Sequence, residues 1–207
     1  MRDREQFEAT AAALRSERQL SPDLQRLARW ISDTFNTDVV NLVVDVLHDG
    51  RPRVMVWLRT ADQAAAFRDS AGNYDRAKQA AISERYAQKF STTKPFVAFT
   101  SFEPEARNRL IGLPPAELQA LRNRLANPAL WRIMAGWGRV IFFVHTDAEA
   151  VALHNGAEFD RWCSEFFDLI TRRDEFDLLS RLPPTFELDS RERYERDFAG
   201  SSYNYFR

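Results

Sequence analysis

The sequence predicts an α/β or α+β fold, with a mixed sheet of about four to six strands and flanking helices in a single domain over residues 1–207. Three observations lead to this prediction. Two alternating segments flank Asp49-Gly50, which is a strong signal for a β-hairpin. Later in the chain, strand and helix patterns alternate, which is typical of crossover connections. The 207 residues are 44% hydrophobic and include 16 Phe and 5 Trp, enough for a core of ordinary size.

The N-terminal half carries the clearest local signals. The first 20 residues read as an N-terminal helix, and Ser21-Pro22-Asp23 has the residues that favour the start of a second one. Thr60 and Gln63 form a capping box that begins another helix. The predicted helices cover residues 3–19, 21–36, 60–69 and 74–90, and the predicted strands cover 39–47, 53–59 and 94–101.

The C-terminal half begins with helical pieces over residues 103–135, interrupted by Gly112, Pro114-Pro115 and Asn127-Pro128. A nearly continuous apolar run over 139–145 predicts a central strand buried on both faces. The remaining elements are helices at 147–155, 158–171 and 172–180, a strand at 185–188, a helix at 189–198 and a last strand at 202–206. Residues 185–207 thus form a strand–helix–strand segment, which could dock on its own chain or on another.

Residues 53–67 and 139–153 resemble each other without gaps. Each copy is a strand followed by a Thr capping box and an Ala-rich helix start. Two interpretations stay open. The chain contains an internal duplication, or capping and packing alone dictate the same pattern twice.

Composition and charge narrow the class of protein. Lys plus Arg is 29 and Asp plus Glu is 30, so a net charge of −1 makes nucleic acid an unlikely partner. The N-terminus has no apolar region of a secretory signal, and no apolar run approaches the roughly 20 residues that span a bilayer. One cysteine, Cys163, excludes a disulfide scaffold and fits a reducing compartment. We therefore expect a cytoplasmic protein without a membrane partner.

Motifs that carry known chemistry are absent from the sequence. Gly136 and Gly138 precede a strand instead of following one, so no phosphate-binding loop is present. No nucleophile elbow, HExxH motif or EF-hand loop occurs, and Cys163 alone cannot form a cysteine-rich zinc site. We expect neither a cofactor nor a metal, and no motif points to a known family.

The ends of two predicted strands carry the first candidate site, a ligand-binding site made of Arg59, Thr60, His145 and Thr146. Ligands gather at the carboxyl ends of strands in open α/β sheets. If the two strands are parallel neighbours, Arg59 and His145 share one edge, where helix N-termini would help to hold an anion. The alternative is that these polar residues only mark the transition to solvent.

The C-terminus carries the second candidate site, formed by Tyr203, Tyr205 and Phe206. Their alternation fits an edge strand with one aromatic face. That strand either completes the domain's own sheet or presents an aromatic edge to a protein partner, since tyrosine is favoured at interfaces.

These observations favour a non-enzymatic intracellular protein-binding protein, such as an adaptor, an immunity-type inhibitor or a regulator. The alternative is an enzyme of unrecognised type, for example a hydrolase that binds an anionic substrate near Arg59 and His145. The sequence predicts a protein partner without identifying it, and it leaves a homo-oligomer open.

Overall fold

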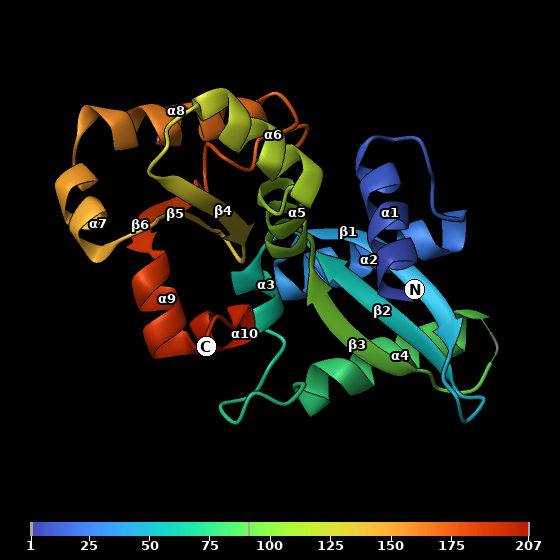
Figure 1. The fold of residues 1–207 in the computed structure, drawn as a ribbon. Helices are drawn as coiled ribbons and strands as arrows, with labels where there is room; N and C mark the ends of the chain where they lie inside the picture. Colours follow the sequence, from blue (N-terminus) through green and yellow to red (C-terminus); the bar gives the residue numbers. More distant parts are fainter. Residues whose placement is uncertain (1, 91, 207) are drawn as a thin grey trace. The chain divides into compact units, whose positions relative to one another are not determined.

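The computed structural model describes residues 2–90 and 92–206 (Figure 1). Within these residues the protein is a mixed α/β structure with ten helices and six strands. The prediction of one sheet with about four to six strands is wrong in its arrangement, because the six strands form two separate three-stranded sheets. Each sheet is mixed, with one antiparallel and one parallel pair of neighbouring strands.

The chain divides into two compact units, unit 1 over Met1–Glu105 and unit 2 over Ala106–Arg207. The single domain over residues 1–207 stays a prediction, and each unit is described by itself. Unit 1 contains α1 (Arg2–Leu14), α2 (Pro22–Phe35), β1 (Val39–Val46), β2 (Pro52–Leu58), α3 (Ala61–Ala65), α4 (Arg76–Phe90) and β3 (Phe96–Ser101). Helix α5 (Phe102–Ile111) contains the division between the units.

The sheet of unit 1 has the order β1-β2-β3 and is packed on both faces. Leu27 and Ile31 of α2 and Ile82 of α4 pack against one face, together with buried residues of all three strands. Helix α1 lies on the other face, where Thr10 Oγ1 accepts a hydrogen bond of 3.0 Å from Asn41 Nδ2. This arrangement follows from the amphipathic pattern of α2 and from the alternation of the strands.

Unit 2 contains α6 (Pro115–Leu125), β4 (Leu130–Gly136), β5 (Arg139–Val144), α7 (Asp147–Leu153), α8 (Ala157–Thr171), β6 (Thr185–Ser190), α9 (Arg191–Phe198) and α10 (Ser202–Tyr205). Its sheet has the order β4-β5-β6. Helices α6 and α8 cover one face around Phe142 and Trp162. An aromatic cluster from α9, α10 and neighbouring residues covers the other face around Phe143 and Tyr194.

The two units repeat the same order of elements and the same strand register. In each, an antiparallel hairpin is followed by a capping box, two helices and a strand parallel to the second hairpin strand. Leu58 pairs with Ser101 as Val144 pairs with Ser190. Both hairpins also have a register shift at the same place, Val39/Asn41 in one and Leu130/Arg132 in the other. Capping alone does not dictate a matching irregularity, so the structure favours the duplication.

Three segments differ from their predicted secondary structure. Residues 130–135, expected to be helical, lie in strand β4 (Leu130–Gly136), because this segment pairs with β5 across a two-residue turn. Residues 172–180 form turns instead of a helix, and Asp177 there adopts a left-handed conformation with φ of 52°. Residues 202–206 were expected to be a strand, but Ser202–Tyr205 is a short helix capped by Ser201.

Candidate functional site

The threonines of the first predicted site act as helix caps. Thr60 Oγ1 accepts a hydrogen bond of 3.3 Å from the Gln63 amide, and the Gln63 side chain accepts one from the Thr60 amide. Thr146 and Glu149 make the same reciprocal pair at 3.1 Å and 2.9 Å. Both hydroxyls therefore satisfy backbone groups of α3 and α7, as a capping box requires.

Arg59 and His145 do not share a sheet edge. They follow β2 and β5, and these strands belong to different sheets, so the condition for a shared edge, that the two strands are parallel neighbours, is not met. The Arg59 guanidinium pairs with the Asp38 carboxylate, and both side chains are partly exposed. The structure thus places the four residues of this predicted site at two separate strand ends.

The C-terminal aromatic residues have three different environments. The Tyr205 hydroxyl donates a 2.6 Å hydrogen bond to Asp189 Oδ2, and its ring packs against Phe143 and Phe198. Burial and the Asp189 carboxylate raise the pKa of the Tyr205 phenol. Phe206 lies on the Trp137 ring at 5.0 Å between centroids, whereas Tyr203 is 66% exposed. The predicted edge strand is wrong, and Tyr205 is a partly buried residue that packs against the aromatic cluster of its own unit.

A groove runs beside strand β4 in unit 2, with a volume of about 400 Å³. Four consecutive residues of β4 line it, and Ile133 packs toward α6 while Met134 packs toward the C-terminal aromatic cluster. Because consecutive strand residues point to opposite faces, the groove must follow the edge of the strand itself. Its lining residues are Leu113, Pro115, Leu118, Gln119, Arg122, Arg132, Ile133, Met134, Ala135, Trp137, Ser202 and Phe206.

Strand β4 is an outer strand of its sheet, since it pairs with β5 alone (Figure 1). Trp137 and Gly138 form the turn between them, with φ values of 48° and 79°, and Gly136 and Arg139 are the flanking pair. In such a hairpin the flanking pair is hydrogen-bonded, and bonded and non-bonded pairs alternate from there. Ile133 and Ala135 therefore direct their backbone N–H and C=O groups toward the groove.

The groove is apolar and positively charged. Arg122 Nε donates a 2.9 Å hydrogen bond to the Leu130 carbonyl, which holds this side chain at one end of the edge. Arg132 is exposed and makes no ion pair with another described residue. No carboxylate occurs among the described lining residues, so the two guanidinium groups are uncompensated.

Trp137 is the most unusual residue of the groove. Its side chain is 70% exposed, and its φ of 48° lies in the left-handed region, where Asn or Gly is preferred at this turn position. A bulky residue there costs roughly 1 kcal/mol or more. A residue that breaks a local rule in this way is a candidate for a functional role. The sequence predicted the turn, but assigning 130–135 to helix concealed the strand edge beside it.

Two clefts of about 370 and 410 Å³ adjoin β6, and His154 and Asp189 line both. Arg196 binds Asp147 at 2.8 Å, and Asp147 also accepts a hydrogen bond from the Ser190 hydroxyl. These contacts lower the pKa of Asp147, with Arg196 as the largest cause. The polar groups here are largely satisfied by one another, which is typical of a structural network.

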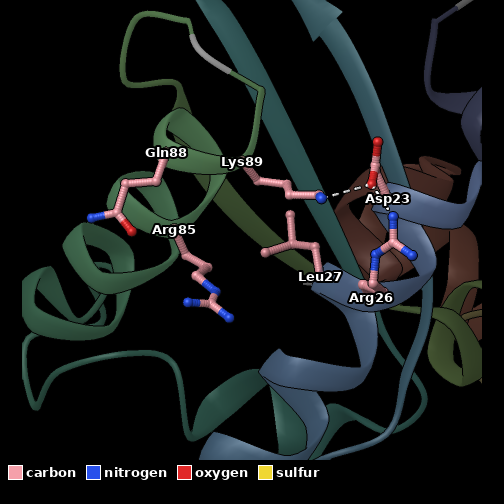
Figure 2. Close-up of a pocket in the computed structure, with 6 residues that line it drawn as sticks. All are labelled: Asp23, Arg26, Leu27, Arg85, Gln88 and Lys89. Atoms are coloured by element: carbon pink, nitrogen blue, oxygen red, sulfur yellow. Dashed lines mark hydrogen bonds and ion pairs between the residues drawn. The ribbon is translucent and has the colours of Figure 1, made fainter.

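A third hollow, of about 310 Å³, lies between α2 and α4 in unit 1 (Figure 2). Asp23 accepts a hydrogen bond from Arg26 and pairs with Lys89 Nζ at 3.0 Å, and these contacts lower its pKa. Arg85 extends from α4 with its guanidinium 5.5 Å from the Trp30 ring centroid. The carboxylate at the centre of this group links the two helices and offsets part of the positive charge.

Cys163 does not have the properties of a nucleophile. Burial raises the pKa of its thiol to about 11, and its side chain packs beside the core of unit 2. Among residues 2–90 and 92–206, no group of three or more His, Cys, Asp or Glu side chains could hold a metal ion. In the same residues, no helix has the length and apolar character needed to cross a membrane.

No family model, curated protein or solved structure matches this chain. The geometry of its own residues must therefore carry the functional argument. Of the four surfaces described, the β4 groove is the one that combines an open strand edge, an exposed tryptophan and uncompensated charge.

Proposed function

We propose that this chain is a non-enzymatic, cytoplasmic protein-binding protein, an adaptor, immunity-type inhibitor or regulator, which holds its partner in the β4 groove of unit 2. The observation that carries the proposal is Trp137, a 70% exposed indole at a turn position that disfavours it, beside an unpaired strand edge. Tryptophan and arginine are enriched among the residues that dominate binding energy at protein interfaces.

The surroundings of Trp137 support this function. Phe206 packs on the indole, and the cation of Arg139 lies 5.5 Å from the Phe206 ring centroid, so the aromatic wall is held in place before a partner arrives. Preorganised aromatic side chains lose little conformational entropy on binding. An exposed strand edge is in addition a template for pairing with another chain.

The test is to purify the tagged protein gently from its own host and to identify what remains bound by native mass spectrometry. We expect a stoichiometric polypeptide with the unsubstituted protein. Trp137→Asn should reduce its retention about tenfold or more, because an interface tryptophan is removed. The fold should persist, since asparagine suits the left-handed turn position.

Val151→Asn is the matched control, because Val151 is also an exposed apolar residue of unit 2, at 79%, but lies on α7 away from the groove. It should retain the polypeptide fully. Equal loss in both variants would contradict the assignment to the groove. A retained small molecule without any polypeptide would contradict protein binding and favour the enzyme alternative.

A further inference from the structure

We infer that the β4 groove takes an extended, acidic segment of a partner protein, which adds to β4 as a fourth strand of the sheet in unit 2. This inference rests on the proposed function and specifies the chemistry of the partner. It follows from the backbone, the charge and the comparison of the two units.

The backbone supplies the first argument. Ile133 and Ala135 present their N–H and C=O groups to the groove, and Trp137 N at the end of the strand is already bonded to Asn108 Oδ1 at 2.6 Å. The unpaired backbone edge of β4 therefore ends at the turn. From there it extends back along the four residues of β4 that line the groove. An extended segment pairs with such an edge through main-chain hydrogen bonds, whereas a helix cannot satisfy these groups.

The two walls of the groove supply the second argument. Side chains of an added strand alternate between two faces. One face of the added strand would meet α6, where Leu118 lies near Arg122. The other face would meet the aromatic wall of Trp137 and Phe206, which lies on the same side of the sheet as Arg132. Each wall thus offers apolar surface and one arginine. The best complement carries a carboxylate and an apolar side chain on each of its faces.

Charge also argues against a second copy of this chain as the occupant. If β4 paired with β4 of another copy, Arg122 and Arg132 of both copies would gather at one interface without a carboxylate from the groove. Like charges across paired strands are destabilising. The positive charge of the two arginines disfavours self-association, and the same charge attracts an acidic partner.

Comparison with unit 1 shows that the first outer strands of the two sheets, β1 and β4, have different surroundings. The position in β1 that corresponds to Arg132 is Asn41, because both follow the register shift and pair with the equivalent residue of the central strand. Asn41 is only 4% exposed and is bonded to Thr10 of α1. In unit 1 the side chain at this position is bonded to α1 on a face of the sheet, whereas in unit 2 Arg132 lines the groove.

The experiment selects random twelve-residue peptides displayed on phage against the full-length protein, then measures affinity of the enriched peptides by fluorescence anisotropy. We expect enriched peptides with net negative charge and no proline in the paired segment. Arg132→Glu should weaken binding about tenfold or more through charge reversal. Arg172→Glu, which reverses an exposed arginine at the end of α8, should leave affinity unchanged.

Amide hydrogen exchange separates strand addition from other modes of binding. A bound acidic peptide should slow exchange at Ile133 and Ala135 at least tenfold, while the amides of α4 in unit 1 keep their rates. Enrichment of neutral or basic peptides, or unchanged exchange at these two residues, would overturn the inference. A dimer formed through β4 in native mass spectrometry would also overturn it.

The two proposals fail in distinguishable ways. If a host polypeptide is retained through Trp137 but acidic peptides do not protect the β4 edge, protein binding stands and strand addition is wrong. If neither a polypeptide nor a peptide binds, both proposals are wrong.

Discussion

Glu158 illustrates how a single carboxylate can organise the start of a helix. It lies in the first turn of α8, and its Oε1 accepts hydrogen bonds from Asn127 Nδ2 at 2.8 Å, Arg161 at 2.7 Å and Trp162 Nε1 at 3.0 Å. Arg161 is the largest cause that lowers the pKa of Glu158 to about 2 from a usual value of 4.5. A lowered carboxylate pKa means that the ionised form stabilises the fold.

The expected consequence is a defined loss of stability in acid. Glu158 contributes stability that is fully present above about pH 4.5 and is lost as the pH falls toward 2, through the pKa of the folded state. Glu158→Gln should lower the free energy of unfolding by about 1 kcal/mol at pH 7, a value discounted because the side chain is 31% exposed. Urea denaturation of both proteins at pH 7 and pH 3 measures the difference.

The control for this prediction is Glu165→Gln on the same helix, where the carboxylate makes a surface pair with Arg124 at 3.1 Å. Surface pairs contribute little, so this variant should change stability by less than about 0.5 kcal/mol. A Glu158→Gln effect that is equally large at pH 3 would show that packing, and not ionisation, explains it.

Cys163 should be unreactive in the folded protein. Because burial raises its thiol pKa from 9.0 to about 11, its thiolate fraction at neutral pH falls about a hundredfold. Ellman's reagent should therefore modify the native protein at least a hundredfold more slowly than the urea-unfolded chain. Comparable rates in the two states would place this thiol outside the core.

At the scale of the element, the β4–β5 turn is held by Arg107. Its side chain donates hydrogen bonds to the carbonyls of Leu182 at 2.8 Å, Pro183 at 2.7 Å and Gly138 at 3.3 Å. A Cβ at Gly138 would lie 1.9 Å from an Arg107 nitrogen, and the φ of Gly138 is +79°. The positive φ favours glycine at this position, and a Cβ there would also force the Arg107 guanidinium to move away from its carbonyl partners.

Gly138→Ala should destabilise the protein by about 2 kcal/mol or more, since it adds backbone strain and displaces Arg107. Gly50→Ala in the hairpin of unit 1 is the matched control, because it has φ of +82° but open space around its Cβ. Gly50→Ala should lower the free energy of unfolding by about 1 kcal/mol, since it adds backbone strain alone. Equal losses in thermal or urea unfolding would mean that the Arg107 contacts contribute nothing.

At the scale of the whole molecule, the chain consists of two units with one plan and two different surfaces. Each has a central strand, β2 or β5, paired on both edges and packed on both faces. Residues Val140–Val144 of β5 are fully buried. What differs is the surroundings of the first outer strand, because α1 packs on the sheet face at β1 whereas a groove runs beside β4.

This plan predicts the pattern of amide hydrogen exchange. Amides of β2 and β5 should be the slowest in their own units, because local opening exposes outer strands first. The outward amides of β4 should exchange much faster than those of β5. Equal protection across all six strands would contradict this order.

The sequence predicted several elements correctly because their causes are local. The β1–β2 hairpin forms as expected, although residues 47–51 connect its strands instead of the two-residue turn that Asp49-Gly50 predicts. Thr60 and Thr146 cap their helices through reciprocal hydrogen bonds. The apolar run at 139–144 forms a central strand buried on both faces. Each of these features depends on a few adjacent residues. Turn preference, capping preference and hydrophobicity all act within such short segments.

The candidate sites were less predictable because they depend on contacts between distant residues. Residues 130–136 become a strand through pairing with β5, and Tyr205 becomes a partly buried helical residue through its contacts with Asp189 and Phe143. A short segment with Trp, Ile, Met and Ala suits helix and strand about equally, so its partner decides. Arg59 and His145 do not share a sheet edge, because β2 and β5 belong to different sheets, and ligand binding by these residues stays a prediction.

By itself, the sequence determined the mixed α/β class, the local starts and turns, and the repeated strand–cap–helix pattern, because backbone preferences and hydrophobic periodicity are properties of neighbouring residues. Only the tertiary structure decided that six strands divide into two sheets and that β4 is left with an open edge beside Trp137. Strand pairing satisfies backbone groups across long stretches of chain, so the position of an unpaired edge depends on the complete arrangement.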